Sequence, residues 1–576
     1  MMGLDNHTMP TQEGENAHPE YKYNKNEMIT QIFFQLVRTK DEKSKLDLIN
    51  KTKEILCNGT MKEVTLLYKV TGYTRDIIAG KGEYELYYML IMCWYDYNPE
   101  LSKFLIEKMV YLTKDREQIH PYGSWKDIKF FCQYCYTKTS NKEHPLINYA
   151  VSLLVRQLKK DVNEEELSLA GKWCPRESSK KFQWLYRKIC MIYYKEYYDT
   201  AKDNTSSFLK ADKKAKMNLR KVLSKLNHKL DTVQIKQCNK TWQDIDHNKT
   251  TSITLNKQTK AFQNVKDGKM RYDDEDRIRC AENFIEFIKS KKDNNQSIKG
   301  KRVSIYDFVK MVLQQDYQDK TTIDTINLQW ENNKQLNSPL TNFIAMVDTS
   351  CSMETENCQP LYNAIGLGIR IAELSKLGKR VLTFSHNPEW INLDNEKTFC
   401  DMVTKVKKAS WSGNTDIYKA FKLILDVIVN NKIPANEVEN MVLVILSDMQ
   451  IDNNIQNRDQ KVLFENIKYM YHITGLQTIN IPYTPPHLVF WNLRSTSGFP
   501  TSSNDLNSTM MSGCSPVMLN AFCEKGMDYL KNITPIKFLE DILTNERYDC
   551  LETECFIHIK EQFKYHQNLF HHNHLE

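Results

Sequence analysis

Two runs of apolar residues, each followed by an aspartate, constrain the fold of this chain more than any other feature. The first lies in the predicted strand 342–347, is apolar from Phe343 onward and ends at Asp348, and the second covers residues 441–446 and leads through Ser447 to Asp448. Strands at the centre of a parallel sheet are covered on both faces, so their residues are apolar throughout instead of alternating. The chain therefore predicts a parallel sheet that carries Asp348 and Asp448 at the carboxyl ends of two strands.

The segments around these runs alternate between strand and helix patterns, which is typical of a doubly wound α/β domain. Ligands of such sheets bind beyond the carboxyl ends of the strands, where the two aspartates would emerge. Further strands are predicted at residues 380–385, 389–393, 487–493 and 516–522, helices at 361–377, 397–408, 417–429, 460–472, 524–530 and 535–543, and loops at 474–486 and 495–512.

Hydroxyl side chains follow the first strand at two-residue spacing. The turn after Asp348 contains Ser350 and Ser352, so two hydroxyls could point to one place beside a carboxylate. Carboxylate, hydroxyl and water oxygens are hard ligands of the kind that Mg²⁺ accepts in an octahedron. Aspartate and serine are also common in ordinary turns and helix caps, and the isolated pattern fits that role equally well.

Two later segments complete a pattern that resembles the metal-ion-dependent adhesion site of the von Willebrand factor A domain. Thr415 lies in a glycine-containing loop at residues 412–416, and Asp448 closes the second strand. The resemblance implies a bound Mg²⁺ or other divalent cation with one coordination position left for a carboxylate of a protein ligand. It also implies hydroxyl ligands from Ser350, Ser352 and Thr415, and carboxylates that act largely through bound water from Asp348 and Asp448.

One position departs from that family pattern. The residue between the two serines is Cys351, where the family usually has a glycine, and a cysteine resists backbone angles that a glycine permits. The departure concerns the geometry of the loop and its metal affinity, and not the fold. Cys351 and Cys358 could alternatively form a redox pair, but a small buried thiol is the favoured role.

Length and composition limit the remaining possibilities. The chain has 576 residues, of which 41% are hydrophobic, enough to form at least two cores. Its longest apolar stretch, residues 87–95, is well short of the ~20 residues that a membrane helix needs. The first 24 residues lack the apolar core of a signal peptide, and the scattered cysteines indicate reduced thiols. We expect an intracellular, cytoplasmic protein, or a virion component if the source is viral.

Helix patterns follow one another from residue 25 to about residue 335. Short helices joined by small polar turns suggest a HEAT-like helical array, although no motif sets a repeat length. The predicted helices cover residues 27–39, 43–57, 61–70, 83–94, 99–112, 125–135, 145–158, 182–197, 209–230, 277–289 and 305–313. The predicted organisation is a disordered N-terminus (1–24), the α-helical array (25–335), a von Willebrand A-like domain (336–545) and a His-rich C-terminal tail (546–576).

Charge differs between the two halves of the chain. Residues 336–576 contain 21 Lys and Arg against 27 Asp and Glu, whereas the preceding residues contain 58 against 45. A dense basic surface can bind the phosphate backbone of RNA with an affinity that falls in salt, but a solvated helix face is an equally good interpretation. The residues predicted to bind nucleic acid crowd one helix: Lys210, Lys213, Lys214, Lys216, Arg220, Lys221 and Lys225.

The order of the halves suggests a second resemblance. Helices that precede a von Willebrand A-like domain resemble the architecture of the Ro autoantigen group, whose helical ring binds single-stranded RNA ends and misfolded RNA. The chain is also similar to an uncharacterised family of plants and giant viruses at residues 78–83, 171–175 and 219–242. That family has no established activity, and an architecture does not imply a function.

Other candidate sites carry weaker signals. Cys132 and Cys135 have the spacing of zinc ligands but no second pair, so core packing is favoured. The histidines of the C-terminal tail could bind a transition metal, although an exposed disordered terminus is favoured. Ser385 and His386 have no recognisable partners for a catalytic triad.

These features favour a non-enzymatic binding scaffold. Its metal site would capture an acidic protein ligand through Mg²⁺, and its basic helices would bind RNA. The alternative is a structural or virion-associated protein-interaction component without nucleic acid. A metal-dependent phosphohydrolase is the weakest hypothesis, because a single-metal site rich in hydroxyls lacks the additional carboxylates, general base or second metal that hydrolysis usually uses.

Overall fold

The computed structural model describes residues 10–14, 16–201, 205–314, 319–384, 387–409, 416–451, 462–496, 498–523 and 525–572. The chain forms two compact units, each assembled from separate segments. The sheet unit comprises Met1–Ile55, Asp246–Asp273 and Ala281–Asn545, and the helical unit comprises Leu56–Ile245, Asp274–Cys280 and Glu546–Glu576. The predicted combination of an α-helical part with an α/β part is confirmed.

A six-stranded sheet organises the sheet unit, in the order β12-β11-β10-β7-β8-β9. Neighbouring strands are parallel, except that β8 and β9 are antiparallel. The order reverses between β7 and β10, which makes this pair the switch point of a doubly wound sheet, where ligands bind. The strands are β7 (Phe343–Asp348), β8 (Arg380–Phe384), β9 (Glu389–Asn392), β10 (Val442–Ser447), β11 (His487–Asn492) and β12 (Ser508–Ser512).

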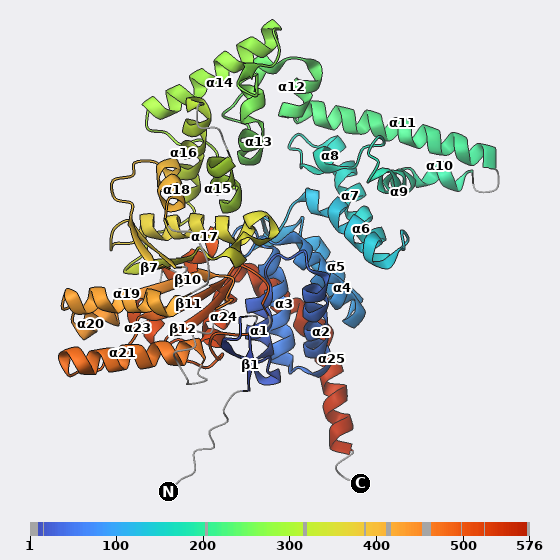
Figure 1. Cartoon of the computed structure of the whole chain (residues 1–576). Coiled ribbons are helices and arrows are strands. Elements are labelled where there is room, and N and C mark those ends of the chain that lie inside the picture. Colours follow the sequence, from blue (N-terminus) through green and yellow to red (C-terminus); the bar gives the residue numbers. More distant parts are fainter. Residues whose placement is uncertain are drawn as a thin grey trace. The chain divides into compact units, whose positions relative to one another are not determined.

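Helices cover both faces of this sheet (Figure 1). Helix α17 (Thr355–Leu374) packs closely on β7. The approach is so close at Gly368 that a Cβ there would lie 2.5 Å from the Val347 side chain. On the other face, α19 (Ile417–Asn430) and α21 (Leu463–Ile479) enclose a core with the apolar residues of the central strands. The apolar runs of β7 and β10 are thus buried from both sides, as their composition predicts.

The last strand does not lie where it was predicted. Residues 516–519 form the 3₁₀ helix η4 instead, and the edge strand is β12, inside the predicted loop 495–512. Serine and threonine can line a buried strand when their hydroxyls find partners. The Ser512 hydroxyl donates to the Phe33 carbonyl at 2.6 Å, and the Ser508 hydroxyl donates to the Asp505 carbonyl at 3.0 Å. The partner Phe33 is distant in sequence, so local composition could not identify this strand.

The predicted boundary at residue 335 also differs from the structure. Helices α15 (Ile305–Gln314) and α16 (Lys320–Lys334) belong to the sheet unit and not to the helical one. The Trp330 ring stacks on Phe399, with centroids 3.8 Å apart, and the Arg370 guanidinium donates to the Asn333 carbonyl at 3.1 Å. The pattern of α15 was predicted and that of α16 was not, and helical periodicity does not reveal which core a helix joins.

The N-terminal segment is ordered where the structure describes it, contrary to the prediction for residues 1–24. Strands β1 (Thr11–Glu13) and β2 (Pro19–Tyr21) form a hairpin, and Tyr21 exchanges backbone hydrogen bonds with Phe499 at 3.0 and 3.1 Å. Helix α1 (Met28–Gln35) then packs against β12. Polar composition suggested disorder, whereas pairing with a distant segment orders these residues. Residues 1–9 lie outside the described part.

The helical unit is a succession of helices, most of which were predicted. Its C-terminal segment differs from the predicted disordered tail, because Asp549–His572 form helix α25. Leu551, Cys555 and Ile559 recur at helical spacing and are buried. The unit contains α3 (Met61–Arg75), α4 (Tyr84–Tyr97), α5 (Pro99–Lys108), α6 (Trp125–Thr139), α7 (Pro145–Asn163), α8 (Ala170–Trp173), α9 (Gln183–Tyr193), α10 (Lys195–Asp199), α11 (Thr205–Lys229) and α12 (Val233–Asn239).

The remaining elements complete the two units. Within the described residues, no helix has both the length and the apolar character to cross a membrane. The other helices are α2 (Glu42–Asn58), α13 (Ser252–Phe262), α14 (Glu275–Asp293), α18 (Phe399–Lys407), α20 (Ala435–Val438), α22 (Asn520–Cys523), α23 (Met527–Lys531) and α24 (Pro535–Ile542), and the short strand pairs are β3 (Leu112–Lys114) with β4 (Glu117–Ile119) and β5 (Val265–Lys266) with β6 (Lys269–Met270).

Candidate functional site

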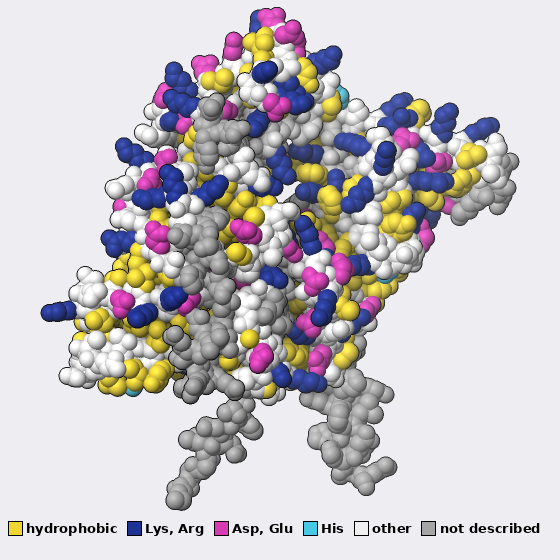
Figure 2. Space-filling view, viewed as in Figure 1, with side chains coloured by type: hydrophobic (Ala, Val, Ile, Leu, Met, Phe, Trp, Pro, Cys, Tyr) yellow, Lys and Arg dark blue, Asp and Glu magenta, His cyan; other side chains and the backbone are white. Residues whose placement is uncertain are grey.

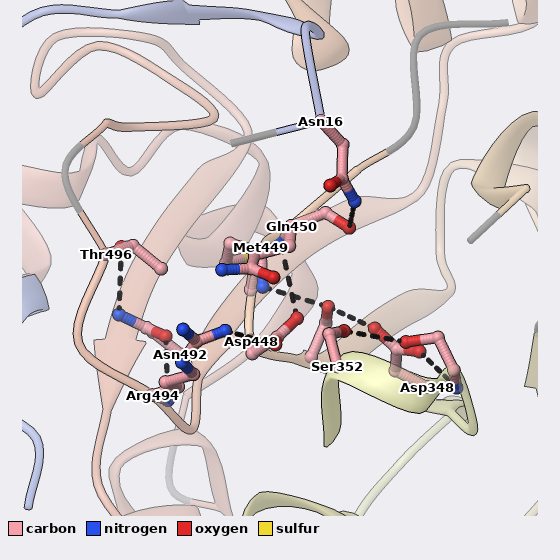
Figure 3. A network of polar contacts seen from close by, with 11 residues as sticks. Asn16, Asp348, Ser352, Asp448, Met449, Gln450, Asn492, Arg494 and Thr496 are labelled. Atoms are coloured by element: carbon pink, nitrogen blue, oxygen red, sulfur yellow. Dashed lines mark hydrogen bonds and ion pairs between the residues drawn. The ribbon is translucent and has the colours of Figure 1, made fainter. Parts of the chain in front are cut away.

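The fold brings Asp348 and Asp448 to the same edge of the sheet. Asp348 is the last residue of β7, Asp448 follows β10, and these two strands are hydrogen-bonded neighbours at the switch point. Both side chains are fully buried. The two aspartates, separated by 100 positions in the sequence, therefore form one polar cluster, shown in Figure 3.

The turn after β7 surrounds the Asp348 carboxylate with donors. The Ser350 backbone N–H donates to Asp348 Oδ1 at 2.9 Å, and the Ser447 hydroxyl donates to Asp348 Oδ2 at 2.6 Å. The hydroxyl oxygens of Ser350 and Ser352 lie 3.0 Å apart. Two of the three predicted hydroxyl ligands thus converge beside the first carboxylate.

The Asp448 carboxylate has a different set of partners. The Gln450 backbone N–H donates to Asp448 Oδ1 at 3.2 Å, and the Arg494 guanidinium donates to Asp448 Oδ2 at 3.3 Å. Asn492, at the end of β11, accepts from the Arg494 backbone N–H at 3.1 Å and so helps to set this loop. Figure 3 shows Arg494 on one side of Asp448 and Ser352 on the other.

Sequence reasoning missed Ser447 and Arg494 as members of the cluster. Ser447 was noted only as the end of an apolar strand, although its hydroxyl bonds to Asp348. Arg494 lies two residues beyond β11, the strand next to β10. This position after a strand is the only feature of the sequence that could have indicated its place in the cluster.

Burial and mutual repulsion dominate the electrostatics of the cluster. Burial, together with the nearby Asp448 charge, raises the pKa of Asp348 to about 7, although hydrogen bonds from Ser447 and Ser350 oppose the shift. Burial likewise raises the pKa of Asp448, against the bond from Gln450 and the charge of Arg494. The partly exposed Arg494 pairs with Asp448, and a bound cation would lower the free energy of the ionised forms of both carboxylates.

The donor set therefore fits a small divalent cation. It consists of two carboxylates and two converging hydroxyls, all hard oxygen ligands. Within the described ranges, no group of three or more His, Cys, Asp and Glu side chains could hold a metal ion. The cluster has only two such residues and relies on hydroxyls for the remainder.

The turn accommodates Cys351 without the backbone freedom of a glycine. Cys351 begins the 3₁₀ helix η3 (Cys351–Glu354) and is not among the described residues with positive φ. Its side chain is exposed, which corrects the predicted buried thiol. Cys351 and Cys358 are both free cysteines, so this structure contains no bond between them.

Several predicted positions lie outside the described residues. They include Thr415, the proposed third hydroxyl ligand, as well as Ser385 and His386. The description resumes at Asp416, whose side chain caps α19 by accepting from the Lys419 backbone N–H at 3.0 Å. Thus the helix after the predicted loop begins as expected.

Helix α11 carries all seven predicted nucleic-acid-binding residues. Its apolar face is buried through Ala215, Leu219 and Leu226. Lys216 forms an ion pair with Asp212 at 2.7 Å, and Arg220 forms one with Glu177 at 3.3 Å. Dark blue side chains are prominent around α11 in Figure 2. We call the exposed lysines the basic stripe: Lys210, Lys213, Lys214, Lys221 and Lys225.

The weaker candidate sites have structural explanations. Cys132 and Cys135 are buried in the helical unit, and burial raises the pKa of both thiols, that of Cys135 to about 12. Neutral buried thiols of this kind are core residues, as favoured above. In the C-terminal helix, His558 pairs with Glu554 one turn away at 3.1 Å.

Fold and site together define an α + α/β protein with a buried polar cluster at the switch point of its sheet. Residues 342–547 match the model of a domain of unknown function (DUF7788), and residues 150–333 match that of a second one (DUF2828). The uncharacterised protein L728 of Acanthamoeba polyphaga mimivirus is 25% identical over 484 residues, which cover 80% of this chain and 76% of that protein. The predicted likeness to an uncharacterised family with a giant-virus member is thereby confirmed.

Proposed function

We propose that this protein is a non-enzymatic binding scaffold whose polar cluster holds Mg²⁺, or another divalent cation, and uses it to capture an acidic protein ligand. The observation that carries this proposal is the convergence of Asp348, Asp448, Ser350 and Ser352 at the switch point of the sheet. Ligands of doubly wound sheets bind at that place.

Each residue of the cluster has a distinct role in this proposal. Ser350 and Ser352 supply direct hydroxyl ligands, and Thr415 supplies the third. Both oxygens of Asp348 already accept hydrogen bonds, from Ser350 and Ser447, which suits a carboxylate that acts on the metal through water. One coordination position then remains for a carboxylate of the ligand, as the resemblance to the von Willebrand factor A domain implies.

The same donor set argues against hydrolysis. Asp448 is engaged by Arg494, and Asp348 by Ser447, so neither carboxylate is placed as a free general base. Two-metal hydrolases add further carboxylates to hold the second ion. Metal-dependent capture therefore explains these residues with fewer additional groups than a phosphohydrolase needs.

The second part of the proposal assigns RNA binding to the helical unit. The basic stripe is exposed and lies opposite the apolar face of α11. Closely spaced lysines attract a phosphate backbone and release its counterions on binding. The unit would then act as a HEAT-like helical array with a basic surface.

A structural or virion-associated component that binds protein without nucleic acid is the second candidate. The giant-virus relative favours it, and so do the ion pairs that neutralise Lys216 and Arg220. In the cytoplasm or in a virion, such a component would use the metal site alone.

Calorimetric titration of the full chain with MgCl₂ and MnCl₂ tests the metal site. We expect binding by the wild type and by Asp426→Ala, which removes an exposed carboxylate of α19, but no binding by Asp348→Ala. Recovery of an acidic partner should need the metal and should survive nuclease. Equal metal affinity of all three proteins would refute the site.

Fluorescence anisotropy with a single-stranded oligouridine over a salt series tests the RNA part. The pair Lys213→Gln and Lys221→Gln removes two charges of the basic stripe and should weaken binding. The pair Lys257→Gln and Lys260→Gln removes two exposed charges of α13 and should not. Absence of binding at low salt would instead favour the second candidate.

A further inference from the structure

A cavity of about 400 Å³ lies at the end of the sheet opposite to the polar cluster. Its floor includes Phe343, the first residue of β7, and its wall includes Ile424 and Val427 of α19. Met441 borders it just before β10. The cavity thus adjoins the amino ends of the strands whose carboxyl ends carry Asp348 and Asp448, so it is a separate site.

Most of the lining is aliphatic or aromatic, but one buried polar group interrupts it. Trp390 of β9 lines the cavity, and its indole Nε1–H is buried without a hydrogen-bond partner in the described part of the chain. A buried donor without an acceptor costs roughly 1–3 kcal/mol. A ligand that offers an acceptor at this place would recover that energy.

A cation lies close to the same wall. Arg380, the first residue of β8, lines the cavity, and its exposed side chain makes no ion pair or hydrogen bond with any residue that the structure describes. In the antiparallel ladder, Arg380 is opposite Asn392, and Leu382 is opposite Trp390. Arg380 and Trp390 are therefore diagonal neighbours on one face, with Cα atoms roughly 7–8 Å apart.

We propose that this cavity binds an amphipathic monocarboxylate, such as a medium-chain fatty acid. Its hydrocarbon chain lies between α19 and the sheet, and its carboxylate accepts from Trp390 Nε1–H and pairs with the Arg380 guanidinium. The volume lies within the roughly 300–1,000 Å³ of small-molecule sites, which combine apolar walls with a few polar groups. A wholly apolar ligand would leave both the indole N–H and the guanidinium without a partner.

Calorimetric titration of the full chain with dodecanoate and with dodecanol tests this proposal. We expect the wild type to bind dodecanoate in the presence of a chelator, because the proposed metal site takes no part. Arg380→Gln should weaken dodecanoate about tenfold, the value of one charge-assisted hydrogen bond, and leave dodecanol nearly unchanged. Trp390→Phe should weaken both compounds, because the alcohol oxygen can also accept from the indole N–H. Lys376→Gln, which removes a nearby exposed cation outside the lining, should leave both affinities unchanged.

Filling the cavity provides a second test. Val427→Trp places a large ring where the hydrocarbon chain would lie and should abolish binding of both compounds, with folding monitored by circular dichroism. If that variant fails to fold, the Arg380→Gln comparison still decides. The proposal is wrong if dodecanoate does not bind the wild type, or if Arg380→Gln weakens the acid and the alcohol equally.

Discussion

The two units differ in how the charges of their buried carboxylates are compensated. In the helical unit, Asp127 receives both the Nε and Nη2 hydrogens of Arg75, at 3.0 and 2.8 Å, and the hydroxyl of Tyr88 at 2.7 Å. In the sheet unit, Asp348 and Asp448 repel each other beside one partly exposed arginine. The comparison distinguishes a buried acid that a buried arginine compensates from two buried acids that repel each other.

The directions of the pKa shifts express this contrast. Burial opposes the ionisation of Asp127, but the charge and hydrogen bonds of Arg75 hold its pKa below the usual value. Burial raises the pKa of Asp348 to about 7, because no comparable partner opposes it. Perturbed carboxylates of the second kind are typical of functional sites.

The largest expected effect comes from breaking the compensated pair. Asp127→Asn leaves the buried Arg75 charge without its partner and should lower the free energy of unfolding by about 3–5 kcal/mol. Urea denaturation measures the change. Glu100→Gln, which breaks the exposed pair with Lys103, is the control and should cost under about 1 kcal/mol. Similar losses in both variants would contradict the contrast between buried and exposed pairs.

Lowering the pH should reduce the stabilisation that the pair of Arg75 and Asp127 provides. Because the folded pKa of Asp127 is lowered, its stabilisation is complete above the unfolded value of about 3.9 and is lost as the pH falls through the folded pKa. The difference in stability between the wild type and Asp127→Asn should therefore be constant from neutral pH to about pH 5 and should narrow below pH 4. A difference that narrows near neutral pH would argue against this assignment.

Removing one of the uncompensated acids should have a different effect. Asp348→Asn relieves the repulsion with Asp448, so the metal-free protein should lose little or no stability. The stabilisation by Mg²⁺, about 2.7 kcal/mol at one hundred times Kd for a single site, should disappear. Melting curves with and without Mg²⁺ measure both quantities, and Asp426→Asn is the matched control. A large loss of stability in the absence of metal would instead show that Asp348, like Asp127, stabilises the fold.

Removing Arg494 tests whether this cation competes with a metal ion for the charge of Asp448. Arg494→Gln deletes the cation that partly balances Asp448 and should raise the affinity for Mg²⁺ several-fold, equivalent to about 1 kcal/mol for a partly exposed pair. Calorimetric titration measures the affinity, with Arg380→Gln, at the opposite end of the sheet, as the control. A weaker affinity would indicate that Arg494 organises the metal site instead of competing with it.

The smallest effect concerns the surface of α11. Lys221→Gln should reduce the slope of log affinity for single-stranded RNA against log salt by about 0.7, the value for one phosphate contact. Lys216→Gln is a demanding control, because Lys216 already pairs with Asp212 and should change the slope less. Equal changes would show that the ion pair does not persist in the complex.

Much of the sheet unit could be predicted because its signals are local. The apolar runs of β7 and β10 identify central parallel strands, and the aspartates that follow them mark the carboxyl edge of the sheet. The edge strand β12 was not predicted, because its Ser512 hydroxyl is bonded to Phe33, which is distant in sequence. Ser447 and Arg494 escaped for the same reason, since their roles depend on which strands are neighbours.

By itself, the sequence determined the periodicities: apolar runs that become central strands, amphipathic helices, and the spacing of Asp348, Ser350 and Ser352. These features follow from the backbone geometry of a few adjacent residues. Only the tertiary structure decided which helices join which core, as for α15 and α16, and that Asp448 and Arg494 meet beside Asp348. Long-range packing sets these relations, because the free energy of burial depends on the contacts that a segment finds elsewhere in the chain.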